Sequence, residues 1–277
     1  MSAAADAGTR RDAVLAATDA LTAAGCDTPR LDAEVLIADA LAVDRGALLA
    51  DPREGVPAPA AREIGERVRR RVAREPVAYI LGRRGFRHIE LNVDRRVLIP
   101  RPETELLVEI ASELASGARV HDVGTGSGAV ALALCDERPD LRVSASDASG
   151  PAVDVARANA RRLGLELAPV VAHGLPDPRA FGASDSGYDL VVANLPYVED
   201  GEPLAPEIAL YEPAEALRGG PDGLDVIREL VSQAPGGSWL ALEHAPHQAA
   251  AVRELLGGSA TRRDLAGRER VTTGWSR

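Results

Sequence analysis

The sequence contains no lysine, and all 32 basic residues among its 277 are arginines. Without lysine the chain cannot form a lysine Schiff base or supply the lysine of a P-loop. The missing lysine accompanies heavy use of alanine, glycine and proline, which is typical of GC-rich genomes. No function follows from it directly.

Aromatic residues and net positive charge are also lacking. Aromatics make up 3% of the chain, too few for the repeated base-stacking platforms of single-strand binders. The 42 acidic residues outnumber the basic ones and give a net charge of -10, which argues against broad neutralisation of phosphates. We therefore expect neither a general nucleic-acid coat nor direct DNA binding.

Cysteines and long apolar runs are equally sparse. Cys26 and Cys135 are far apart and form no CxxC pair, so we expect a reducing compartment and no zinc cluster. His244 and His247 are three apart but have no third ligand nearby, and no metal site is expected. The start, residues 1–11, has no apolar signal core, and the longest apolar run, residues 129–135, is too short to span a membrane. These features predict a soluble cytoplasmic protein without membrane contact.

The length suggests roughly two domains, at about 150 residues each. Residues 1–76 have helical spacing of apolar residues, with a helix start at Thr28 and Pro29. Residues 77–100 change to a period of two, which predicts a β-hairpin linker. Residues 101–277 alternate strands with helices and predict an α/β fold with a doubly wound, mostly parallel sheet. The expected strands are residues 119–123, 141–146, 169–172, 188–193 and 238–243.

The predicted helix over residues 60–74 carries a run of arginines with Glu63 and Glu66 between them. One interpretation is a solvated helix face with local ion pairs. The other is a basic patch that faces an acidic partner or RNA. The arginines are Arg62, Arg67, Arg69, Arg70, Arg71 and Arg74.

A glycine loop, residues 122–128 (DVGTGSG), follows the first strand of the α/β region. Glycines there let a ligand approach the backbone at a helix start. Asp147 ends the next strand, where a carboxylate can accept hydrogen bonds from ribose hydroxyls. Loop and acid predict a nucleoside-cofactor cleft, but they fit a nicotinamide dinucleotide and S-adenosyl-L-methionine (AdoMet) equally well.

The tetrapeptide Asn194-Leu195-Pro196-Tyr197 follows the fourth strand, at the sheet edge where ligands bind in such folds. It resembles the Asn/Asp/Ser-Pro-Pro-Tyr motif of methyltransferases that act on nitrogen in planar groups. The lone pair of such a nitrogen is delocalised, so its hydrogens must be held by acceptors. The Asn194 side chain and the Leu195 carbonyl can accept them, and Tyr197 can stack on the planar group.

Nearly the whole chain resembles the protein-(glutamine-N5) methyltransferases that modify class 1 peptide chain release factors. The most diagnostic motif is IPRPETE, within residues 98–105 and before the glycine loop. DNA and rRNA methyltransferases that share the tetrapeptide generally lack this motif after a helical domain. The motifs are residues 75–82 (EPVAYILG), 98–105 (LIPRPETE), 122–128 (DVGTGSG), 194–197 (NLPY), 211–213 (YEP), 219–224 (GGPDGL), 242–244 (LEH) and 269–271 (ERV).

The resemblance implies a seven-stranded Rossmann-like methyltransferase sheet over residues 101–277 and a helical substrate-docking domain over residues 1–76. It implies that a monomer transfers a methyl group from AdoMet to the side-chain amide nitrogen of the glutamine in the Gly-Gly-Gln motif of a release factor. The cofactor product would be S-adenosyl-L-homocysteine. The implied cofactor residues are Gly124, Thr125, Gly126, Ser127, Gly128, Asp147, Leu175 and Asn194, and the implied catalytic and substrate residues are Asn194, Leu195, Pro196 and Tyr197. The alternative is an N6-adenine or N2-guanine methyltransferase of nucleic acids with the same tetrapeptide.

The chain departs from the family pattern in two places. Leu195 stands where the family usually has proline, but it keeps the backbone acceptor and precedes Pro196, so we expect function to survive. Residues 172–175 (AHGL) stand where relatives often have an acidic residue followed by a large apolar one. At that end of the cleft we expect Leu175 to supply an apolar wall.

Overall fold

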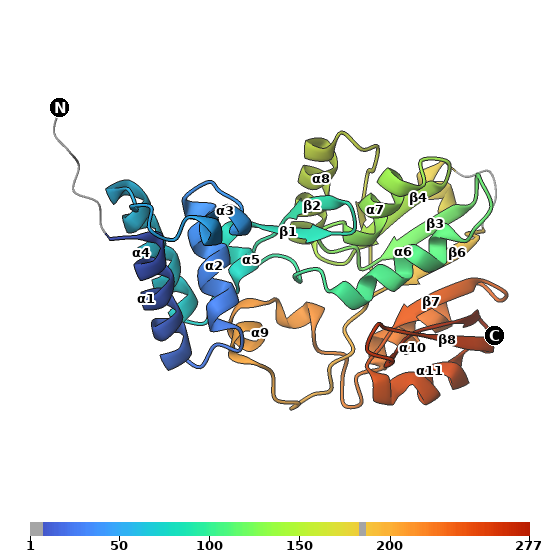
Figure 1. Cartoon of the computed structure of the whole chain (residues 1–277). Helices are drawn as coiled ribbons and strands as arrows, with labels where there is room; N and C mark the ends of the chain where they lie inside the picture. Colours follow the sequence, from blue (N-terminus) through green and yellow to red (C-terminus); the bar gives the residue numbers. More distant parts are fainter. Residues whose placement is uncertain (1–7, 183–186) are drawn as a thin grey trace. The chain divides into compact units, whose positions relative to one another are not determined.

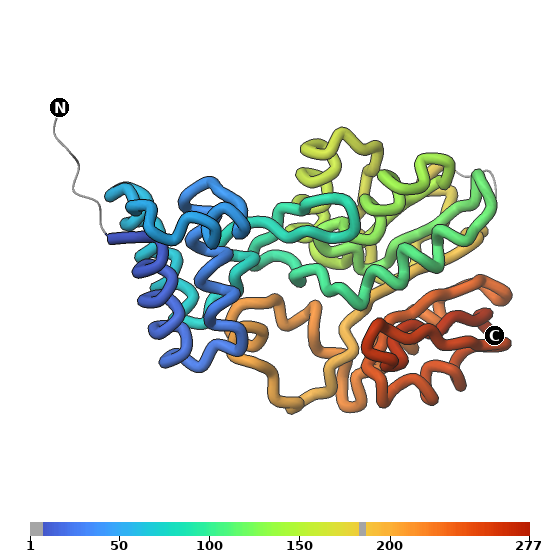
Figure 2. The backbone as a smooth tube through the Cα atoms, in the orientation of Figure 1, coloured from blue at the N-terminus to red at the C-terminus, as the bar shows by residue number. Residues whose placement is uncertain are grey.

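The computed structural model describes residues 8–182 and 187–277, so the first seven residues of the segment 1–11 lie outside the described part. The chain forms two units. One comprises residues 1–82 and 204–211, and the other comprises residues 83–203 and 212–277. The course of the chain can be followed in Figure 2. None of the helices in the described ranges has both the length and the hydropathy that crossing a membrane requires.

The first unit is helical. Its helices are α1 (Arg10–Ala23), α2 (Pro29–Ala40), α3 (Arg45–Ala50), α4 (Ala58–Val72), α5 (Val77–Leu81) and α9 (Pro206–Tyr211). Thr9 caps α1 through a reciprocal pair of hydrogen bonds with Asp12, and Pro29 occupies the first turn of α2 as predicted. The apolar faces of α1, α2, α3 and α4 meet in one core around Leu21, Ile37 and Leu48.

The arginine run of α4 and Arg74 is largely engaged in ion pairs within this unit. The first interpretation predicts ion pairs, but its solvated helix face is wrong for Arg71, which is buried and pairs with acids distant in sequence. Arg71 binds Asp32 at 2.7 Å and Glu207 of α9 at 2.8 Å, with all three side chains mostly buried. Arg74 also binds Glu207, at 2.6 Å. Three more arginines of the run pair with acids: Arg67 with Asp39 and Glu63, Arg69 with Glu66, and Arg70 with Glu75.

The predicted hairpin is shorter than residues 77–100. Its strands are β1 (Arg83–Phe86) and β2 (Ile89–Asn92), which pair antiparallel. Residues 77–81 form helix α5 instead, because Pro76 precedes its first turn and Gly82, with φ of 71°, ends it in the left-handed conformation.

The second unit contains a seven-stranded sheet, which confirms the predicted fold class. The strand order is β5-β4-β3-β6-β7-β9-β8, and β9 runs antiparallel to both of its neighbours. The strands are β3 (Arg119–Val123), β4 (Arg142–Asp147), β5 (Val170–Val171), β6 (Leu190–Ala193), β7 (Trp239–Glu243), β8 (Gly257–Arg263) and β9 (Glu269–Trp275). The carboxyl ends of the parallel strands β3, β4 and β6 therefore bring the glycine loop, Asp147 and Asn194 to one edge.

Helices cover both faces of this sheet (Figure 1). On one face, α10 (Asp225–Gln233) and α11 (Ala249–Leu255) pack Ile227, Leu230 and Val252 against side chains of β6 and β7. On the other, α6 (Glu105–Ser112) and α7 (Ala129–Glu137) pack on the central strands and on each other, and α8 (Gly150–Leu163) packs on β4 and β5. The edge of the sheet that carries the glycine loop is thus held by a core on each side.

Candidate functional site

The glycine loop connects β3 to α7 and has three glycines with positive φ, at Gly124, Gly126 and Gly128. A Cβ atom at Gly128 would lie 2.8 Å from the Leu132 side chain, so glycine is needed there for helix packing. A Cβ at Gly124 would lie 3.0 Å from Leu195, the leucine that replaces proline. Around Gly126 there is open space. The loop is therefore shaped by its neighbours at both ends and open in the middle.

A cavity of about 360 Å³ lies beside this loop and belongs wholly to the second unit. We call it the loop cavity. Its volume lies within the usual range for small-molecule sites. Of the residues predicted from sequence, Gly124, Thr125, Gly126, Ser127, Asp147, Asn194, Leu195 and Pro196 line it.

Three predicted residues are placed elsewhere. Gly128 starts α7 and packs against that helix, and Leu175 packs against the core beneath α10. Tyr197 also packs against that core and turns its hydroxyl toward Glu243. Ala172, His173 and Gly174 do line the cavity, together with Glu229 and Leu230 of α10.

Asp147 is fixed by the backbone at the end of β4. Its two carboxylate oxygens accept hydrogen bonds from the Gly126 and Ser149 amides, each at 2.8 Å. Each oxygen keeps a further lone pair, so the side chain can still accept bonds from a ligand's hydroxyl groups. Burial raises the pKa of Asp147, and the two amide bonds act against that rise.

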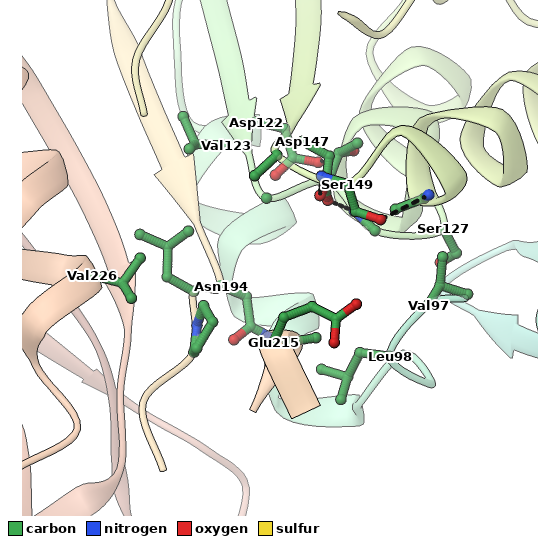
Figure 3. Close-up of a pocket in the computed structure, with 18 of the residues that line it drawn as sticks. Val97, Leu98, Asp122, Val123, Ser127, Asp147, Ser149, Asn194, Glu215 and Val226 are labelled. Carbon is green, nitrogen blue, oxygen red and sulfur yellow. Dashed lines mark hydrogen bonds between the residues drawn. The ribbon is translucent and has the colours of Figure 1, made fainter. Parts of the chain in front are cut away.

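The charge of the loop cavity favours a cationic ligand. Asp122, Asp147, Glu215 and Glu229 line it, whereas Arg96, which binds Asp94, is the sole basic side chain among its described lining residues, His173 aside. Figure 3 shows Asp147, Glu215 and Asn194 around the same space. Because a dinucleotide carries an anionic pyrophosphate and AdoMet carries a sulfonium and an ammonium group, this lining fits AdoMet better.

The Asn194 side chain has a defined direction. Its Nδ2 atom donates to the Thr104 hydroxyl at 2.9 Å, and Thr104 ends the short helix η1 (Pro102–Thr104). The amide oxygen therefore stays available to the loop cavity. The Leu195 carbonyl oxygen likewise accepts no hydrogen bond from the described residues. Two consecutive residues after β6 therefore each keep an acceptor that no described donor uses.

The backbone of the tetrapeptide is supported by the glycines of residues 219–224. A Cβ at Gly219 would lie 2.4 Å from the Pro196 carbonyl oxygen, and one at Gly223 would lie 2.1 Å from that of Tyr197. The Gln248 amide donates to the same Tyr197 carbonyl at 2.9 Å. Only glycine allows this close approach, which explains the GGPDGL motif physically.

Sequence reasoning gave no role to Thr104, Glu215, Glu229 or Glu243, although all four contact this site or its tetrapeptide. Thr104 and Glu243 lie within the motifs of residues 98–105 and 242–244. The motifs therefore contain Thr104 and Glu243, but the sequence did not predict which residues these two contact.

Two of the five histidines pair with nearby side chains. His121 is fully buried, and its ring nitrogens pair with the Ser144 and Ser146 hydroxyls at 2.8 Å. Burial lowers the pKa of His121 to about 3, so it is neutral. His247 pairs with Glu199 at 2.9 Å. Within residues 8–182 and 187–277, no group of three or more His, Cys, Asp or Glu side chains could hold a metal ion.

Comparison with known proteins agrees with this architecture. Residues 12–82 match the PrmC N-terminal domain, and residues 102–218 match the methyltransferase small domain. The catalytic domain of hMettl16, at 14% identity and a TM-score of 0.50, covers 67% of this chain and 75% of its own and shares the fold.

Relatives similar over almost the full length are named release factor glutamine methyltransferases. The protein from Mycolicibacterium smegmatis is 42% identical to this chain, and the alignment covers 95% of this chain and 96% of the relative. The protein from Pseudomonas aeruginosa is 44% identical, and the alignment covers 90% of this chain and 94% of the relative. The chain belongs to the release factor glutamine methyltransferase family.

Proposed function

We propose that this protein transfers a methyl group from AdoMet to the side-chain amide nitrogen of the glutamine in the Gly-Gly-Gln motif of class 1 release factors. The observation that carries the proposal is the pair of free acceptors, Asn194 Oδ1 and the Leu195 carbonyl, at the rim of the loop cavity. They lie where a planar amide with two hydrogens could be held.

The residues of the loop cavity fit AdoMet. The open middle of the glycine loop can receive its methionine part, and Asp147 has lone pairs left for its ribose hydroxyls. The Glu215 and Glu229 carboxylates complement its positive charge. When bound, this cofactor supplies a methyl group made electrophilic by its sulfonium sulfur.

The tetrapeptide prepares the amide nitrogen. Asn194 and Leu195 accept its two hydrogens, which fixes the plane of the amide and so directs the nitrogen lone pair toward the methyl donor. Tyr197 packs beneath them and supports the end of the tetrapeptide. No side chain needs to remove a proton beforehand, because the nitrogen becomes acidic only once it is alkylated. The contribution of these residues is positioning.

We assign docking of the release factor to the helical domain, over residues 1–76 of the first unit. Most arginines of α4 are bound to acids within this unit, so docking relies on the domain surface as a whole rather than on a free basic run. We further infer a monomeric, cytoplasmic enzyme that does not bind DNA directly, in keeping with its net charge of -10.

The test is a labelling experiment with radioactive AdoMet. The protein is incubated in parallel with a release factor, the same factor with its Gly-Gly-Gln glutamine changed to alanine, tRNA, rRNA and DNA. We expect label in the intact factor alone. Label in a nucleic acid but not in the factor would favour the adenine or guanine methyltransferase instead.

A further inference from the structure

Arg101 forms an ion pair with a buried carboxylate and has no assigned role. Its Nη2 atom donates to Glu212 Oε1 at 2.5 Å, and the Glu212 side chain is 1% exposed. The other carboxylate oxygen, Glu212 Oε2, accepts a hydrogen bond from the Ile99 amide at 3.2 Å. Both oxygens are therefore bound by the segment of residues 99–101, which fixes the direction of the Arg101 side chain.

Arg101 lies beside the part of the loop cavity that the tetrapeptide lines. Its carbonyl oxygen accepts a hydrogen bond from the Thr104 amide at 3.2 Å, and the Thr104 hydroxyl accepts one from Asn194 at 2.9 Å. The chain neighbours of the ion pair, Pro100 and Pro213, both line the cavity, whereas Arg101 itself does not. Arg101 is thus placed outside the cavity, on the side of Asn194.

The Arg101 guanidinium keeps hydrogen-bond donors that the fold does not use. An arginine side chain has five N–H donors. Within residues 8–182 and 187–277, Glu212 is the sole acceptor that this side chain meets. Its Nε and Nη1 atoms are not among the buried atoms without a partner, and the side chain is 29% exposed. These donors are therefore open to a ligand, while the ion pair holds the group in one direction.

An anchored guanidinium with open donors can bind carboxylates, phosphates and carbonyl oxygens. The carboxylate of AdoMet is one such group, but the cofactor belongs in the loop cavity, which Arg101 does not line. The proposed substrate segment begins with two glycines, which offer only main-chain groups to the enzyme. Because Asn194 and the Leu195 carbonyl hold the glutamine amide, the main chain of this segment must pass close to the tetrapeptide, outside the cavity.

We propose that Arg101 is a substrate-binding residue that donates hydrogen bonds to main-chain carbonyl oxygens of the Gly-Gly-Gln segment, and that Glu212 is the positioning residue that holds it. This inference rests on the proposed function and extends it to the main chain of the substrate. The tetrapeptide holds the side-chain amide of the glutamine, and Arg101 holds the backbone that carries it. Two separate contacts then fix the glutamine for transfer.

The first arm of the test is binding of a release factor in the presence of S-adenosyl-L-homocysteine, which has no methyl group to transfer. Arg101→Met should raise the Kd of the release factor by about tenfold or more, because it removes charge-assisted hydrogen bonds. The Kd of S-adenosyl-L-homocysteine itself should stay within about threefold. Unchanged binding of the factor, or an equal rise in both Kd values, would overturn the inference.

The matched control is Arg87→Met. Arg87 pairs with the mostly buried Glu137 at 2.7 Å in the same unit, and its exposure is similar to that of Arg101. This variant breaks a comparable ion pair away from the tetrapeptide, so it should bind the release factor like the wild type. An equal loss of binding in both variants would show that the effect is not specific to Arg101 and would contradict the inference.

The second arm is kinetics with the release factor as substrate. Main-chain hydrogen bonds act alike in the ground state and in the transition state. Arg101→Met should therefore raise KM by about tenfold or more and leave kcat within about threefold. A lower kcat with an unchanged KM would contradict the inference.

A double variant separates substrate binding from simple neutralisation of Glu212. Arg101→Met leaves Glu212 buried without its cation, and Glu212→Gln in the same chain removes that charge as well. The melting temperature should recover in the double variant. KM should stay at the level of Arg101→Met, because Glu212 acts only through Arg101. A KM that returns to the wild-type value, or that exceeds the value of Arg101→Met, would overturn the inference.

Failure of this inference can be told apart from failure of the proposed function. If the wild type labels no release factor, both are wrong. If the wild type labels the factor and Arg101→Met binds and methylates it equally well, the role of Arg101 alone is wrong.

Discussion

Asn194 is the side chain on which the proposed chemistry depends most directly. Asn194→Ala removes one of the two acceptors at the rim of the loop cavity, but leaves Asp147 and the glycine loop in place. We expect turnover to fall by about a hundredfold or more, with AdoMet affinity within about tenfold of the wild type. Calorimetric titration and single-turnover labelling measure the two quantities separately. Wild-type turnover would disprove the role of Asn194.

Glu243 also makes stability depend on pH. Its pKa is raised by burial from 4.5 to about 7, so between these values the folded chain holds a proton that the unfolded chain has lost. Native stability therefore falls as pH rises through this window, by on the order of 3 kcal/mol, and the loss is complete above about pH 7.

Glu243→Gln removes this charge. Its melting temperature should exceed that of the wild type at pH 8.5, and the difference should shrink at pH 5.5. Thermal unfolding at the two pH values measures both. A difference that is the same at both pH values would show that Glu243 has an ordinary pKa in the folded protein.

At the scale of elements, the segment of residues 219–224 supports the tetrapeptide by close backbone contact. Gly223→Ala would place a Cβ 2.1 Å from the Tyr197 carbonyl oxygen at a φ of +73°. We expect a shifted tetrapeptide and turnover reduced by about tenfold or more. Steady-state labelling measures the loss. Gly236→Ala, where the added Cβ meets nothing within 4 Å, is the matched control, and equal activity of the two variants would contradict this account.

Helix α9 is held in the helical unit largely by side-chain ion pairs of Glu207. Glu207→Gln would leave Arg74 without its carboxylate and Arg71 with Asp32 alone, in a mostly buried cluster. We expect the helical unit to lose about 2 kcal/mol and the amides of α4 and α9 to exchange faster. Hydrogen exchange followed by mass spectrometry measures this. Glu66→Gln, from an exposed pair with Arg69, should change little, and unchanged exchange in Glu207→Gln would refute the role of the cluster.

The sequence predicted the elements with strong periodicity best. The predicted strand of residues 188–193 contains β6, because the buried residues of this central strand form a continuous apolar run, LVVA. The hairpin of β8 and β9 was not predicted, since β8 (Gly257–Arg263) is polar, with no residue fully buried, and its pairing partner is all that defines it. The membership of α9 in the helical unit was equally hidden, because no residue of α9 is buried.

The functional site also has features that the sequence predicted and features that it did not. Residue types and strand ends were enough to place Asp147 and Asn194 at one edge of the sheet, because parallel strands end together. They did not predict that Gly128 serves helix packing or that Glu229 lines the same cavity as Ala172 and His173. Nor did they predict the contact of Thr104 with Asn194, across a sequence separation of 90 residues. Such contacts depend on tertiary packing.

For the whole molecule, the charge distribution supports a protein substrate. The net charge is -10, and four arginines of α4, together with Arg74 just after it, are bound to acids of their own unit. A nucleic-acid enzyme with the same tetrapeptide would need a free basic face to hold phosphates. An acidic enzyme with a separate helical unit is better suited to another protein.

The most direct measurement of this central claim is the site of methylation. A release factor treated with AdoMet and the protein is digested, and the peptide with the Gly-Gly-Gln motif is fragmented in a mass spectrometer. We predict the added mass of one methyl group on the glutamine side chain, and none after treatment with Asn194→Ala. A methyl group on any other residue, or an unmodified factor together with methylated RNA or DNA, would contradict it.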